Sequence, residues 1–165
     1  MFRRKSNSDD TRDAFAIQRQ AAGLANRAIE YLQQDNVDVA RKDMDAAMKL
    51  APSSLDVRSM AIAFHHNLNE FDRALEIING TTDQMINQTD NILEKFGYYN
   101  YSGRLLIAVD QNNRAVEQLN KALEIATSEE YAEDLRFLVE AGIDEDPSPQ
   151  PYIDEVKELL ALTTA

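Results

Sequence analysis

One helical pattern recurs along this chain, and this repetition limits the folds that the chain can adopt. Between Val37 and Leu50, apolar residues follow one another at steps of three and four around Ala40. The same spacing returns around Ala74, 34 residues further on, and around Ala115, after another 41 residues. Steps of three and four residues place side chains on one face of an α-helix. The sequence therefore predicts three related helices, each with one apolar face to bury.

Each of these helices belongs to a predicted pair. A long apolar pattern covers Asp10 to Gln34 and is followed, after a polar turn, by the helix from Val37 to Leu50. Pro52 ends this second helix, because proline lacks the N–H group and its ring clashes with the preceding turn. One such hairpin cannot bury its own apolar face, whereas three stacked hairpins bury a continuous core. We therefore expect an all-α fold, built as a short α-solenoid of three helical hairpins.

The hairpins resemble the tetratricopeptide repeat (TPR) family over about residues 21 to 129. In the first copy, the positions that match the family's small, aromatic and proline residues are Ala28, Tyr31, Ala40, Ala47 and Pro52. The matching positions of the third copy are Gly103, Leu106, Ala115 and Ala122. The second copy departs from the pattern, since Ile62 and His65 replace the small and the aromatic residue, and Asn79-Gly80-Thr81 interrupts its second helix. The resemblance implies three repeats, at about 21–54, 55–88 and 96–129. A helical bundle without repeats is the alternative.

Seven additional residues separate the second copy from the third. Seven residues make about two helical turns, so the first helix of the third copy can lengthen without rotating its apolar face. We expect this helix to start at Asp83 or Asp90 and to end at about Val109.

Four parts are predicted along the chain. Residues 1–9 form a flexible N-terminal tail, and residues 10–143 form the TPR-like repeat domain, which a helix at about 129–141 caps. Residues 144–151 are an acidic, proline-rich linker, because proline keeps the preceding residue out of helical conformations. Residues 152–165 form an amphipathic helix with an apolar stripe of Ile153, Val156, Leu159 and Leu160. This helix either packs on the capping helix or docks elsewhere, in its own molecule's groove or on a second copy.

Charge limits the partners that the chain is expected to bind. Seventeen basic and twenty-nine acidic side chains give a net charge of −12, which repels phosphate backbones. We therefore expect a protein or peptide partner that is neutral to basic overall, and no nucleic acid. No apolar stretch reaches the length of a membrane span, which is about 18 residues. The absence of cysteine fits a reducing compartment, so we expect a soluble, cytoplasmic protein without membrane contact.

Catalytic or metal-binding groups are not indicated by the sequence. The two histidines, His65 and His66, are neighbours, and neighbours on a helix point about 100° apart, so they cannot share one metal ion. The glycines are too scattered for a phosphate-binding loop. The carboxylates are expected on solvated faces or at helix starts, as in Asp43, Asp45, Glu117 and Glu124. We expect a protein that is not an enzyme and that needs no cofactor or metal.

The resemblance to TPR proteins implies a binding surface. In that family the first helices of successive repeats line a concave groove that takes a peptide or a helix of another protein. The residues that the alignment carries into this groove are Ile29, Gln33, Ala63, His66, Asn67, Asn100, Tyr101 and Arg104. Tyr101 and Arg104 lie three residues apart on one helix face, and both residue types are frequent in interface hot spots. Arg104 is the expected cation of the groove, suited to one acidic contact.

The function implied by this reading is non-catalytic protein binding, as an adaptor or an assembly factor. A small secretion-type chaperone built on TPR repeats is one alternative, and it predicts a co-purifying client and dimerisation. A structural subunit that self-assembles through its C-terminal helix, as a homo-oligomer, is the other.

Overall fold

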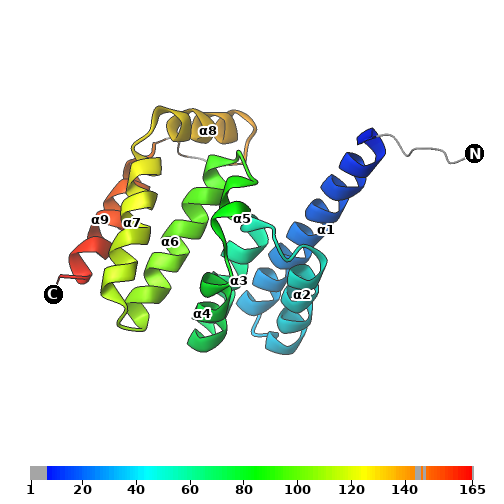
Figure 1. Cartoon of the computed structure of the whole chain (residues 1–165), viewed down its shortest axis with the longest axis horizontal. Helices are drawn as coiled ribbons and strands as arrows, with labels where there is room; N and C mark the ends of the chain where they lie inside the picture. Colours follow the sequence, from blue (N-terminus) through cyan, green and yellow to red (C-terminus); the bar gives the residue numbers. More distant parts are fainter. Residues whose placement is uncertain (1–6, 144–145, 147, 165) are drawn as a thin grey trace, which may run out of the picture.

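The structure, a computed structural model, describes residues 7–143, 146 and 148–164, with side chains from residue 13 onward. This part of the chain is built from helices and contains no strand, so the prediction of an all-α fold is confirmed (Figure 1). The helices are α1 (Asn7–Gln33), α2 (Val37–Leu50), α3 (Leu55–Asn67), α4 (Phe71–Asn79), α5 (Asp83–Asn87), α6 (Ile92–Ala108), α7 (Asn112–Ala126), α8 (Glu129–Glu140) and α9 (Gln150–Leu162).

The helices pack as successive pairs. α1 lies against α2, α3 against α4, and α6 against α7 (Figure 1). The first helices of these pairs form a row, in which α1 contacts α3 and α3 contacts α6. The contact between α1 and α2 contains Ala28, Ala40 and Ala47, which are fully buried. Small side chains at this contact let the two helices approach closely.

The turn inside each pair has the same conformation three times. One residue of each turn has a positive φ, which is 59° at Asp35, 57° at Asn69 and 59° at Asp110. The next residue donates its N–H to a carbonyl five residues back: Asn36 to Tyr31 at 2.9 Å, Glu70 to His65 at 2.8 Å and Gln111 to Leu106 at 2.8 Å. Aspartate and asparagine adopt the left-handed conformation more readily than other residues with a Cβ. The three pairs therefore share one turn geometry although their turn sequences differ.

The helix bounds correct several predictions. α1 begins at Asn7, so the last three residues of the predicted tail, 7–9, are helical, while residues 1–6 lie outside the described part. Of the two predicted starts of the next helix, Asp83 is wrong and Asp90 is close, because α6 runs from Ile92 to Ala108 and the residues from Asp83 form the separate helix α5. The break occurs because the Asn91 side chain caps α6 and accepts hydrogen bonds from the N–H groups of Leu93 and Glu94.

The remaining bounds are close to the prediction. α2 has the predicted ends, and α8 ends one residue before the predicted end of the capping helix. α9 begins at Gln150, two residues early, so the end of the predicted linker is helical. Residues 144, 145 and 147 of that linker lie outside the described part, as does residue 165. α4 has nine residues and stops at Asn79, where the predicted interruption lies.

The C-terminal helix α9 docks on its own chain. It lies against α7 and α6, and Val156 is fully buried there. The Tyr152 ring contacts two other rings, Phe96 of α6 at 5.7 Å and Tyr131 of α8 at 5.9 Å between centroids. The helix therefore packs mainly on α7, which neither predicted placement named, and it also touches the capping helix α8 through Tyr152.

The contact of Gly103 on α6 with Leu119 on α7 gives a test of this packing. A Cβ atom on Gly103 would lie 2.5 Å from Cδ2 and 2.6 Å from Cγ of Leu119, whose side chain is fully buried. We expect Gly103→Ala to lower the free energy of unfolding by about 1–3 kcal/mol through overpacking. Gly97→Ala on the same helix is the control, because no other atom lies within 4 Å of its added Cβ. That variant gains helix propensity and is expected to be up to about 1 kcal/mol more stable. Urea unfolding of both variants measures the difference, and equal stabilities would contradict the packing.

Candidate partner-binding groove

The first helices of the three pairs, α1, α3 and α6, line a groove of about 450 Å³. We call them the inner helices, and the surface that they form together the inner face. The residues around it are Asn26, Ile29, Met60, Ala63, His66, Asn67, Tyr101 and Arg104. Six of the eight residues predicted for the binding surface are in this set. Gln33 lies on α1 and is exposed, but it does not line the groove. Asn100 is only 6% exposed and lines the neighbouring cavity instead.

This neighbouring cavity, of about 410 Å³, lies between α6, α8 and α9 and shares Tyr101 and Arg104 with the groove. Glu155 of α9 reaches into it. It forms an ion pair with Arg104 and accepts a hydrogen bond from Nδ2 of Asn100 at 2.9 Å. The cation expected to meet an acidic partner group is therefore already paired within the chain. The Oδ1 atom of Asn100 is buried and accepts no hydrogen bond from the described residues.

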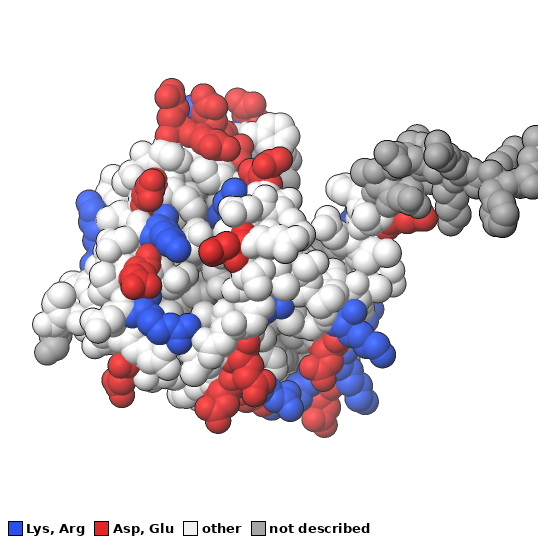
Figure 2. Space-filling view, viewed as in Figure 1, with Lys and Arg blue, Asp and Glu red and all other residues white. Residues whose placement is uncertain are grey.

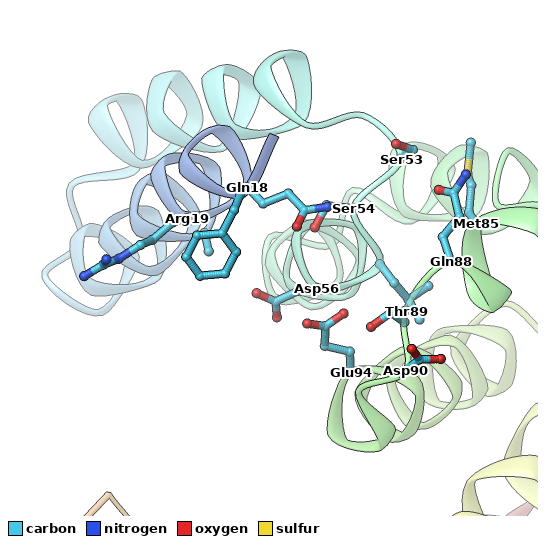
Figure 3. A pocket seen from close by; sticks show the side chains of 13 residues that line it. Gln18, Arg19, Ser53, Ser54, Asp56, Met85, Gln88, Thr89, Asp90 and Glu94 are labelled. Atoms are coloured by element: carbon cyan, nitrogen blue, oxygen red, sulfur yellow. The ribbon is translucent and has the colours of Figure 1, made fainter. Parts of the chain in front are cut away.

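A third cavity, of about 350 Å³, lies where α1 passes the beginnings of α3 and α6. Figure 3 shows the carboxylates of Asp56 and Glu94 next to each other in it, while the Arg19 side chain points away from them. Asp56 is in the first turn of α3 and Glu94 in the first turn of α6. Burial, and then the negative charge of Glu94, raises the pKa of Asp56 to about 6. The two acids form no ion pair within the described part of the chain.

These cavities are parts of one continuous surface. A connecting cavity of about 310 Å³ is bounded by Asp56 and Glu94 at one end and by Met60 and Tyr101 at the other. It thus shares residues with both the acidic cavity and the groove. The inner face therefore runs from the acidic pair, past Tyr101, to Arg104 and its partner Glu155.

The two histidines have different environments. His65 is 6% exposed, and its Nδ1 lies 2.7 Å from Oε2 of Glu70, which also binds Arg41. His66 is half-buried in the groove. Burial, and then the positive charge of Arg104, lowers the pKa of His66. The groove therefore offers a neutral imidazole at neutral pH, which can both donate and accept a hydrogen bond.

One carboxylate is not where it was predicted. Asp43 was expected on a solvated face, but it is 8% exposed and accepts hydrogen bonds from Nε and Nη2 of Arg27 at 2.6 and 2.7 Å. The Arg27 side chain, from the neighbouring helix, lowers the pKa of Asp43. Asp45, Glu117 and Glu124 are exposed as expected.

Sequence reasoning missed the acidic pair and Glu155. First-turn acids on adjacent inner helices lie near each other, so Asp56 and Glu94 could have been found from the later of the two predicted starts of α6. The pairing of Glu155 with Arg104 joins residues 51 apart, and no local pattern predicts it.

Among the described residues, no cluster of three histidine, cysteine or acidic side chains is arranged to hold a metal ion. In the same part of the chain, no helix is both long and apolar enough to cross a membrane. Comparisons with protein-family models, with curated proteins and with solved structures found no match to this chain. The resemblance to TPR proteins therefore stays a prediction.

The raised pKa of Asp56 predicts how stability depends on pH. The charged groups that line the cavity around it are Arg19, Asp90 and Glu94. Because the folded state holds the proton more tightly than the unfolded state, the carboxylate costs stability as pH rises through about 6. Asp56→Asn removes that cost.

We expect Asp56→Asn to raise the melting temperature at about pH 7.5, by about 2–4 °C for each kcal/mol that burial and repulsion of the carboxylate cost, and to raise it less at about pH 5. Asp72→Asn, in the exposed first turn of α4, is the control. Thermal melts followed by circular dichroism measure both variants. A gain that does not depend on pH would contradict the assignment.

Proposed function

We propose that this protein is a non-catalytic protein-interaction module, an adaptor or assembly factor, which holds a peptide or helix of a partner in the groove between α1, α3 and α6. The observation that supports this proposal most is the grouping of the predicted residues. Ile29, Ala63, His66, Tyr101 and others were carried over from the alignment with TPR proteins, and they lie around one groove. These residues lie on three different helices, so they can line one groove only because α1, α3 and α6 lie side by side.

The repeated turn supports a TPR-like solenoid as the architecture behind this function. Asp35 and Asn69 lie 34 residues apart and have the same positive φ and the same turn hydrogen bond. The spacing equals the length of the family's repeat. Such an array presents one concave face made by its inner helices.

The chemistry of the groove suits a short apolar segment held by a few polar contacts. Ile29, Met60 and Ala63 provide apolar surface, and Tyr101 is 38% exposed above them. Asn67 and the neutral His66 provide hydrogen-bonding groups. The groove is already open in the isolated chain, so a partner segment inserts without rearrangement of the helices.

Self-assembly through the C-terminal helix has less support. The apolar stripe of α9 is used inside the chain, where Val156 is fully buried. A second copy can take this helix only if it first leaves α7. We propose a cytoplasmic location on composition alone, because the chain contains no cysteine.

The test is affinity capture from a lysate of the source cells after mild crosslinking, with Tyr101→Ala beside the unchanged protein. Loss of an interface tyrosine costs about 1.4 kcal/mol or more at a hot spot, so we expect at least about tenfold less captured partner. Phe137→Ala is the matched control, since Phe137 is an exposed aromatic residue on α8 that does not line the groove. Arg104→Ala is not suitable, because it leaves Glu155 without its partner. Equal capture by all three proteins would contradict the proposal.

A further inference from the structure

The free charge of the inner face is negative, and it lies at one end. Near α9, Arg104 is paired with Glu155, and burial lowers the pKa of His66, which is therefore neutral at neutral pH. At the other end, the carboxylates of Asp56 and Glu94 lie next to each other and form no ion pair with a described residue, and the Arg19 side chain of the same cavity points away from them (Figure 3). Two adjacent carboxylates repel each other, and a cation placed between them would remove that repulsion.

Helix capping explains only part of this arrangement. An acidic residue in the first turn stabilises a helix through the helix dipole, which accounts for each acid separately. It does not account for a half-buried Asp56 opposite a second carboxylate, because burial and repulsion both oppose its charge. The pair is therefore unfavourable in the isolated chain.

The cavity around the acidic pair has the shape and the wall for a long basic side chain. It holds about 350 Å³ and opens beside Phe15, whose side chain is 66% exposed on α1. Lysine and arginine bury their aliphatic stems against apolar surface and keep their charged ends at polar groups. An arginine can also stack on an aromatic ring.

The surroundings of the acidic pair add to the negative charge at this end of the inner face, because α8 contacts α6. The neighbouring helix α8 is acidic as well, and Figure 2 shows carboxylates gathered over it. The acids exposed there are Glu129, Glu130, Glu133 and Glu140.

We propose that the partner segment is basic, and that one of its lysine or arginine side chains enters the cavity beside Phe15 and pairs with Asp56 and Glu94. This inference rests on the proposed function, since it concerns the occupant of the same inner face. The apolar part of the segment then lies along Met60 and Tyr101, towards the groove.

The test uses random-sequence peptides displayed on phage and selected with the full chain. We expect the selected peptides to share a lysine or arginine at a fixed distance from an apolar residue. Selection with the double variant Asp56→Asn/Glu94→Gln should lose the basic residue. Selection with Tyr101→Ala should recover few peptides of any kind.

A selected peptide then gives the affinities, measured by fluorescence anisotropy. We expect the Asp56→Asn/Glu94→Gln variant to bind it at least about tenfold more weakly than the unchanged protein. The control is Asp38→Asn/Glu117→Gln, which makes the same change of net charge at exposed positions on α2 and α7 and should bind normally. Raising the ionic strength from about 0.01 M to about 0.15 M should weaken the unchanged protein more than the Asp56→Asn/Glu94→Gln variant.

The outcomes separate the two proposals. Selected peptides without a common basic residue, or equal affinity of the two double variants, would overturn the inference and leave the groove intact as a binding site. Recovery of no peptides above the level of Tyr101→Ala would overturn the proposed function, and the inference with it. Unfolding curves of each variant test whether it is folded. We expect no loss of fold, because neutralising Asp56 should stabilise the chain.

Discussion

The left-handed turn inside each helix pair is the constraint on which the rest of the structure depends. A positive φ at Asp35, Asn69 and Asp110 reverses the chain in the same way three times. Because the turns are alike, each second helix returns along its first helix in the same way, and the first helices α1, α3 and α6 contact one another in a row. The groove residues come from three helices, and they meet only because this row is regular. A change in one turn would rotate one inner helix and divide the surface.

Small side chains between the paired helices allow short distances between the helix axes. Alanine fills the contact of α1 with α2, and Gly103 lets α6 approach Leu119 on α7. The two helices of a pair therefore lie close together, and the first helices of neighbouring pairs are in contact. Larger residues gather where the array ends, in the aromatic cluster of Phe96, Tyr131 and Tyr152 that joins α6, α8 and α9. The open side of the last pair is closed by this cluster.

Local patterns predicted the features that depend on local physics. The periodicity and Pro52 fixed the ends of α2, and repeat register brought Ile29, His66 and Tyr101 to one surface. The alignment also placed His66 in the groove, which it lines. The apolar spacing of the additional residues left two possible starts for α6, Asp83 and Asp90, and the cap at Asn91 lies next to the second of them.

Ion pairs between residues far apart in the sequence could not be predicted from local patterns. The contacts of Asp43 with Arg27 and of Glu155 with Arg104 join side chains 16 and 51 residues apart, and each depends on how far a flexible arginine reaches. Exposed and buried carboxylates have the same local sequence signals, so Asp43 was assigned to solvent. Where the acidic pair lies could be predicted only once α3 and α6 were both placed.

The length of α1 has a consequence for dynamics. From Asp13 to Gln20 every side chain is exposed, and this half of the helix extends beyond α2 (Figure 1). From Ala21 onward the same helix is packed against its neighbours. Backbone hydrogen bonds in an unpacked segment open at low free energy, so amide hydrogen exchange should be fast in the first half of this helix and slow in the second. A partner resting on Phe15 would extend the slow region towards the N-terminus, at the expense of conformational entropy.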